Sequence, residues 1–128
     1  AILRAEWPAE MNLPGLRLSR EREPLPTGTE VAYTGYGFGS DESLIKVLST
    51  YRGIISSRVA RGKSFFYHLS GLVNQGLSGC ALYLPGSGEV VGIVTSQFGP
   101  PGLGVGFGGA VPSAVIGRLA ENVSRAYR

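Results

Sequence analysis

The chain has 128 residues, a net charge of +3 and a hydrophobic fraction of 43%, which is enough apolar material for one globular domain. This composition excludes a disordered tail, and no apolar stretch approaches the roughly 20 residues that a membrane-spanning helix needs. The basic residues are scattered and no stripe of aromatic residues accompanies them, so we expect no nucleic-acid partner.

The N-terminal quarter lacks a clean periodic pattern. Residues 2–5 read as a short strand, whereas residues 7–28 are rich in Pro, Arg, Glu and Leu. We interpret this second segment as an extended connector that lies over a surface, with Leu13, Leu16 and Leu18 tucked against it.

The middle of the chain has the features of β-structure. Residues 30–35 contain the β-branched and aromatic residues that favour a strand, and residues 65–69 form a second such run. Between them, residues 45–59 alternate in places and predict one or two strands, with Gly53 as the site of a bulge or sharp bend. Residues 61–63 predict a turn.

The C-terminal part combines a hairpin, a loop and a helix. Residues 81–84 and 89–96 flank the turn sequence Pro-Gly-Ser-Gly, which predicts a hairpin. Residues 99–109 form a loop rich in Gly and Pro around a short strand. From Ser113, a candidate N-cap, apolar residues recur with helical spacing at Val115, Leu119 and Val123. Several short strands followed by one helix indicate an all-β fold, a small antiparallel barrel or sandwich, with a C-terminal helix.

Scarce residue types limit the chemistry that the chain can perform alone. Cys80 is the only cysteine, so an internal disulfide and an all-cysteine metal site are both impossible. His68 is the only histidine and Asp41 is the only aspartate. We therefore predict no metal site and no cofactor.

The turn Gly76-Leu77-Ser78-Gly79 is the candidate for chemistry. Acyl transfer needs a hydroxyl that stands clear of the backbone, and N–H groups that point at the oxygen that becomes negative. Glycines allow the backbone angles that aim such N–H groups, because they carry no Cβ. Taken alone, however, a serine between glycines is more often an ordinary turn.

The surrounding residues resemble a known family. GLSGCALYLPGSGEVVGIVTSQ, from Gly76 to Gln97, resembles the segment of trypsin-like serine peptidases in which the nucleophile loop leads into a hairpin. GTEVAYTGYG, from Gly28, is similar to the first strand of their second barrel, and Gly106-Phe107 with the later AVPS resembles the end of HtrA/Deg-type peptidases. The resemblance implies a Greek-key β-barrel, the second half of the trypsin-like fold. We divide the chain into connector and first strand (1–28), barrel (29–111) and terminal helix (113–126).

The resemblance also implies roles for individual residues. Ser78 would be the nucleophile, and the N–H groups of Gly76 and Ser78 would form the oxyanion hole. Thr95, Ser96 and Gln97 would line an edge strand that pairs with a peptide substrate. Leu72 would lie at the base of the primary specificity pocket and Gly106 on its wall, which implies cleavage after small or medium apolar residues.

The same resemblance implies that half of the active site lies elsewhere. In this family the catalytic histidine and aspartate come from the preceding barrel, and residues 1–4 resemble the run just after that aspartate. We therefore expect the chain to be a fragment that is inactive alone. Leu77 also replaces the usual Asp or Asn, and Cys80 and Ala81 replace the common Gly-Pro.

The sequence also permits other interpretations of the site. A private triad of Ser78 with His68 and Asp41 is disfavoured, because the family does not use that histidine position and the aspartate lies in a polar loop. The nucleophile elbow of α/β-hydrolases is excluded because a strand, and not a helix, is expected after Ser78. A dinucleotide-binding site in the Gly-rich loop is excluded because the chain leaves no room for the second strand and its acidic residue. A peptide-binding or protein-interaction module without catalysis stays open as the alternative. Self-association through the face that the missing barrel would cover is also expected.

Overall fold

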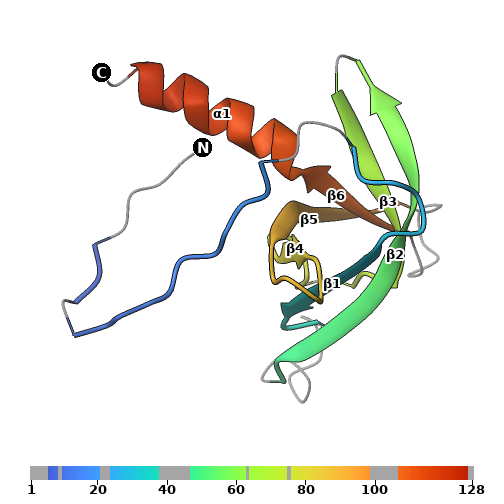
Figure 1. Cartoon of the computed structure of the whole chain (residues 1–128). Coiled ribbons are helices and arrows are strands. Elements are labelled where there is room, and N and C mark those ends of the chain that lie inside the picture. Colours follow the sequence, from blue (N-terminus) through green and yellow to red (C-terminus); the bar gives the residue numbers. More distant parts are fainter. Residues whose placement is uncertain are drawn as a thin grey trace.

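The β-strands of the computed structural model close into one antiparallel barrel, and a single helix follows it (Figure 1). The structure describes residues 6–8, 10–20, 24–37, 47–62, 64–74, 76–98 and 107–126. The elements are β1 (Glu30–Gly35), β2 (Ser49–Arg61), β3 (Ser64–Leu72), β4 (Ala81–Tyr83), β5 (Val90–Phe98), β6 (Phe107–Pro112) and α1 (Ser113–Ala126). The predicted all-β barrel with a C-terminal helix is therefore confirmed.

The order of the strands around the barrel is β1-β2-β3-β6-β5-β4, and every neighbouring pair is antiparallel. The barrel closes where β4 pairs with β1, with Ala32 opposite Tyr83. After β3, the chain crosses to β4 on the far side of β6 and β5. The loop that makes this crossing contains Ser78, so the topology brings it close to β5.

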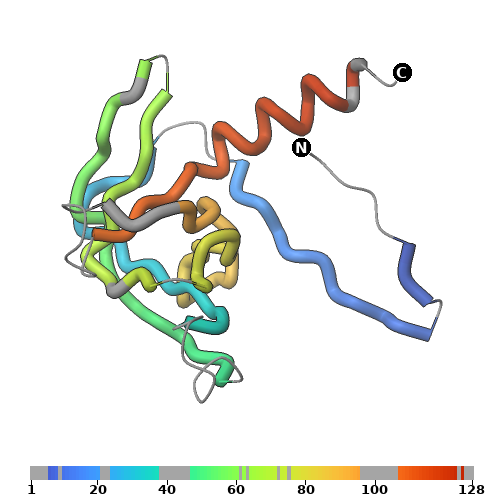
Figure 2. Tube along the Cα trace, turned by 180° about the vertical axis from the view of Figure 1, so that it is seen from behind, coloured from blue at the N-terminus to red at the C-terminus, as the bar shows by residue number. Residues whose placement is uncertain are grey.

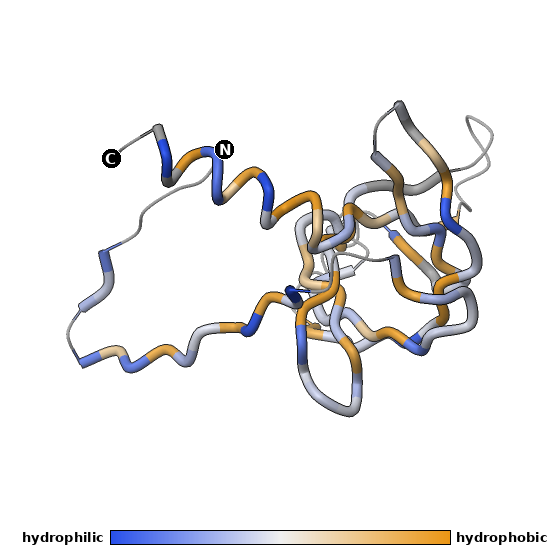
Figure 3. The backbone as a smooth tube through the Cα atoms, turned by 45° about the horizontal axis from the view of Figure 1, so that its top comes forward, coloured by the Kyte–Doolittle hydropathy of each residue, from blue (hydrophilic) through white to orange (hydrophobic). Residues whose placement is uncertain are grey.

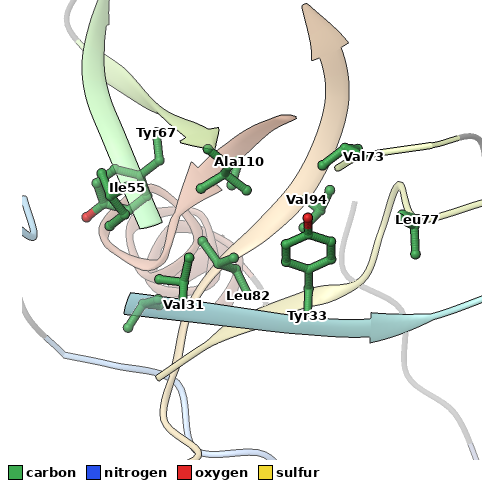
Figure 4. Close-up of a cluster of buried hydrophobic side chains, with 11 residues drawn as sticks. Val31, Tyr33, Ile55, Tyr67, Val73, Leu77, Leu82, Val94 and Ala110 are labelled. Atoms are coloured by element: carbon green, nitrogen blue, oxygen red, sulfur yellow. The ribbon is translucent and has the colours of Figure 1, made fainter. Parts of the chain in front are cut away.

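The inward side chains of the strands fill the barrel with apolar residues (Figure 4). In β1, Val31 and Tyr33 point into the interior, and Leu82 and Val94 meet them from β4 and β5. Each such side chain contributes about 1.5–3 kcal/mol when it is fully buried. Leu77, from the loop before β4, is also fully buried and belongs to this core.

Within the segment 45–59, predicted to hold one or two strands, the structure has a single strand, β2, which begins at Ser49. Gly53 stands in regular register opposite Val31, so the expected bulge is not at this glycine. The irregularity lies two residues later, between Ile55 and Ser57 in the pairing with β3. Gly53 is instead a point of close approach, because a Cβ there would lie 2.9 Å from the backbone nitrogen of Gly71.

The N-terminal segment forms an arm that extends away from the barrel and reaches it at residues 17–19 (Figures 1 and 2). It is held there by a parallel bridge, in which the Ser19 N–H donates to the Val90 carbonyl at 2.7 Å and the Val90 N–H donates to the Arg17 carbonyl at 2.8 Å. Leu18 is half-buried beside this bridge. The expectation that Leu13 and Leu16 are also tucked in is wrong, since they are 54% and 74% exposed. The predicted strand at 2–5 lies outside the described residues.

The helix α1 projects from the barrel on the same side as the arm, and hydrophobic stretches occur along both segments (Figure 3). It begins at Ser113, as predicted, directly after β6. Its Leu119 is 46% exposed, so the apolar stripe predicted from the helical spacing is only partly covered by described residues. Within the part of the chain that the structure describes, no helix is both long enough and apolar enough to cross a membrane.

Candidate active site

Ser78 lies at the surface in the loop between β3 and β4. Two hydrogen bonds tie this loop to β5: the Gly79 N–H donates to the Val94 carbonyl at 2.7 Å, and the Val94 N–H donates to the Cys80 carbonyl at 2.9 Å. The Leu77 side chain, buried in the core, holds the loop from the inside. Ser78 is therefore exposed on a loop that is anchored on both sides of it.

The two glycines around Ser78 both have left-handed backbone angles, with φ +96° at Gly76 and +93° at Gly79. A side chain is strained in this region, whereas glycine adopts it freely. At Gly76 there is a second requirement, because a Cβ would collide with the carbonyl oxygen of Tyr36. The turn conformation around Ser78 therefore depends on glycine at position 76 for two separate reasons.

The Ser78 hydroxyl donates a hydrogen bond to the backbone carbonyl of Thr95 at 3.1 Å. This contact brings together two of the residues that the sequence predicts for one site. A peptide carbonyl accepts the hydrogen bond but does not take up the proton, so this partner does not turn the hydroxyl into a nucleophile.

Among the described residues, the end of strand β5 beside Ser78 pairs with a strand on one side only. Its residues Ser96 and Gln97 stand opposite Gly109 and Gly108 of β6. On the other side, the pairing with β4 runs only as far as Ile93, opposite Ala81, and is extended one step by the bond between Val94 and Cys80. Among the described residues no strand pairs with Ser96 and Gln97 on that second side, which is the side that approaches the Ser78 loop.

Of the two predicted pocket residues, the structure describes the backbone of Leu72. Leu72, the last residue of β3, stands opposite Phe107 of β6, and Phe107 in turn stands opposite Phe98 of β5. The backbone of Leu72 is thus two strands away from the end of β5. Gly106 lies outside the described residues, so its predicted place on the pocket wall is not described.

The contacts of His68 lie on the outside of the barrel. Its neighbours Tyr67 and Leu69 are buried in the core, and the alternation along β3 turns His68 outward. There its Nδ1 lies 3.4 Å from the Ser57 hydroxyl and its ring centroid lies 5.2 Å from that of Phe107. Asp41 lies outside the described residues. The arrangement offers no support for a private triad.

Cys80 is the other potential nucleophile near Ser78. Its sulfur packs against the backbone of Gly35, where a Cβ would collide with it. Burial raises the pKa of the Cys80 thiol, which keeps it in the less reactive protonated form. Among described residues, no cluster of three or more His, Cys, Asp or Glu side chains is able to hold a metal ion.

Three features of this site are not predicted from the sequence. The Tyr36 carbonyl oxygen occupies the space that a Cβ at Gly76 would need, and the apolar Leu77 packs the loop into the core. In addition, the Asn74 side-chain nitrogen is buried without a hydrogen-bond acceptor. Of the three, only Leu77 carried a signal in the sequence, because an apolar residue in a polar turn favours burial.

The sequence matches no protein-family model and no curated protein. The structure, however, is similar to solved structures of HtrA-type proteases. A serine-to-alanine variant of the HtrA-type protease AlgW with a decapeptide shares 25% sequence identity over 91% of this chain and 35% of that chain, with a TM-score of 0.68. AlgW with a decapeptide gives 26% identity over 89% of this chain and 34% of the other, with a TM-score of 0.66.

A third structure, the same variant with a tripeptide, gives 28% identity over 90% of this chain and 36% of the other, with a TM-score of 0.63. The chain therefore spans about a third of the length of these proteases. The closed six-strand barrel and its terminal helix therefore fit one barrel half of the trypsin-like fold, and the chain is similar to HtrA-type proteases over about nine-tenths of its length.

Proposed function

We propose that the chain is the nucleophile-bearing half of a serine endopeptidase, with Ser78 as the attacking residue. The observation that carries this proposal is the exposed Ser78 hydroxyl, held 3.1 Å from the Thr95 carbonyl between two glycines with positive φ. In this geometry a substrate carbonyl can reach the Ser78 hydroxyl. The glycine conformations also allow the N–H groups of the turn to point at the carbonyl oxygen of the substrate.

The chemistry requires a base, and none of the residues that the structure describes provides one near Ser78. A histidine, oriented by an aspartate, takes the Ser78 proton as the Oγ attacks the carbonyl carbon of the scissile peptide bond. The carbonyl oxygen becomes negative and is stabilised by the N–H groups of Gly76 and Ser78. The leaving amine then takes the proton from the histidine, and water hydrolyses the acyl-enzyme. We propose that this histidine and this aspartate come from a second barrel of the same polypeptide.

The substrate we propose is an extended peptide that pairs with β5. Ser96 and Gln97, beside the Ser78 loop, pair with β6 on one side, and their other side offers backbone donors and acceptors, which is how an added strand binds to a sheet. The similar AlgW structures contain a decapeptide or a tripeptide. We place the primary specificity pocket at Leu72 and Gly106, with a preference for small or medium apolar residues.

An apolar hollow supports the need for a second barrel. It measures about 210 Å³ and lies next to Gly79. It is lined by Leu16, Leu18, Gly79, Ala81, Val90, Ile93 and Ile116. Removing apolar surface from water is favourable, so a partner that packs on this hollow would stabilise the fold. A barrel docked on this hollow would also carry its residues up to the Ser78 loop.

A fluorophosphonate probe, which labels activated serines, tests this proposal. We expect a stable adduct on Ser78 when the polypeptide includes an upstream barrel with a histidine and an aspartate, and none on the 128-residue chain alone. Ser78→Ala should abolish the adduct. Ser87→Ala, at an exposed serine of the β4–β5 turn, is the matched control and should leave labelling unchanged. Absence of a Ser78-dependent adduct in the longer polypeptide would contradict the peptidase proposal.

The open side of β5 also favours a second candidate, a peptide-binding module without catalysis. In that case the peptide pairs with Ser96 and Gln97, and Ser78 is only a turn residue. Peptide binding by fluorescence anisotropy separates the two candidates: binding that persists in the longer polypeptide without any Ser78 adduct or cleavage would favour the module.

A further inference from the structure

A second hollow lies between the arm and the helix α1, away from Ser78. It has a volume of about 1050 Å³, and Arg17, Arg20 and Arg118 contribute its basic side chains. Glu89 and Glu121 contribute its acidic ones. The remaining lining residues are Leu18, Ser19, Ser113, Ala114 and Gly117. We call this hollow the arm–helix groove.

The arm segment that carries Arg17 and Arg20 is held in place by backbone hydrogen bonds. The two hydrogen bonds between Val90 and the 17–19 segment hold the arm against β5, so Arg17 and Arg20 lie on a backbone that is tied down. Arg118 faces the groove from α1. Among the described residues, none of these three guanidinium groups forms an ion pair. Among the described lining residues, three arginines against two glutamates therefore give an excess of positive charge.

The N-terminus of α1 opens into the same groove. The first N–H groups of a helix have no partner within the helix, and they carry a partial positive charge. No acidic residue in the first turn of α1 compensates that charge. Ser113 lines the groove and is only 5% exposed, and its hydroxyl has no hydrogen-bond partner among the described residues.

We propose that the arm–helix groove binds an oxyanion, a phosphate or carboxylate group, at the N-terminus of α1. The free N–H groups and the Ser113 hydroxyl would donate to its oxygens. Arg17 and Arg118 would approach it from opposite walls with the forked, charge-assisted hydrogen bonds that guanidinium groups form with oxyanions. This site is separate from the peptidase chemistry and does not depend on it.

The test uses the 128-residue chain and three probes at matched ionic strength: inorganic phosphate, glutarate and chloride. We expect phosphate or glutarate to raise the melting temperature more than chloride does, because a ligand that binds only the folded state stabilises it. In NMR titrations, the shifted amide signals should be those of residues 113–118 and 17–20. Tighter binding of phosphate would indicate a phosphate-bearing ligand, and tighter binding of glutarate a carboxylate-bearing one.

Variants locate the site. Arg17→Gln and Arg118→Gln should each weaken the affinity for the preferred probe by about fivefold or more, and Ser113→Ala should also weaken it. Arg58→Gln, at an exposed arginine of β2 outside the groove, is the matched control and should change nothing. The proposal is overturned if phosphate and glutarate act no differently from chloride, or if the Arg58 variant loses as much affinity as the groove variants.

Discussion

Gly76 shows at the scale of one residue how the backbone prepares Ser78. Gly76 has a positive φ and no room for a Cβ, so no other residue fits at this position. A substitution there would therefore disturb the Ser78 turn and lower the stability of the fold together. The sequence predicts a glycine-dependent turn here, but it does not predict the Tyr36 carbonyl behind it. That contact joins residues 40 positions apart, and only the folded barrel creates it.

We expect Gly76→Ala to lower the free energy of unfolding by about 2 kcal/mol or more, because it combines backbone strain with a collision. Gly28→Ala is the first control: its φ is +89° but its surroundings are open, so it carries the strain alone. Gly86→Ala, with open space and no positive φ, should be nearly neutral. Urea denaturation measures all three. Equal effects at positions 76 and 28 would contradict the role of the Tyr36 contact.

Tyr33 predicts a dependence of stability on alkaline pH. Burial, together with the neighbouring Tyr51, raises the pKa of Tyr33 from 10.0 to about 12. The folded state therefore favours the neutral phenol, and the stability that this provides is complete below pH 10 and is lost as the pH rises toward 12. In urea denaturation, Tyr33→Phe should show a smaller loss of stability than the parent chain between these pH values. An equal loss in both chains would show that Tyr33 is not responsible.

At the scale of the elements, the backbones of β2 and β3 approach each other closely at Gly53 and Gly71. The sequence predicts both strands and marks Gly53 as the site of a bulge or a sharp bend; of these two alternatives, the bulge is wrong. The register is regular there and the bulge falls between Ile55 and Ser57. A single glycine in a strand pattern is compatible with either a bulge or a close backbone approach. Only the position of Gly71 decides between them.

Gly53→Ala should therefore destabilise the chain by about 1–3 kcal/mol, because the new methyl group would lie 2.9 Å and 3.1 Å from backbone atoms of Gly71. Gly117→Ala in α1 is the opposite case. Its added methyl group meets nothing within 4 Å, and alanine favours the helix by about 0.5–1 kcal/mol. Thermal unfolding followed by circular dichroism should move in opposite directions for the two variants, and a stabilising Gly53→Ala would contradict the close approach.

At the scale of the whole molecule, the arm and α1 leave apolar side chains uncovered beside the barrel. Leu16 is 74% exposed and Leu119 is 46% exposed. The predicted burial of Leu16 fails because the residues that the structure describes provide no surface to cover it. Such a surface favours association with another polypeptide.

We therefore expect the 128-residue chain to form dimers as its concentration rises. Leu16→Ser combined with Leu119→Ser should shift the molecule toward the monomer. Val59→Ser, at a residue that is 48% exposed on β2, is the matched control and should leave the dimer intact. Size-exclusion chromatography with light scattering measures the mass directly, and a monomer at every concentration would contradict the expectation.

The sequence by itself determined the local structure: the strands, the hairpin turn at 85–88, the helix that begins at Ser113 and the glycine turn around Ser78. These features depend on residues that are near one another in the chain, where periodicity and turn chemistry act. The tertiary structure decided the pairing of β3 with β6, the approach of Gly53 to Gly71 and the contact of Ser78 with Thr95. Each of these joins residues far apart in the chain, and they meet only because the six strands must close around one core.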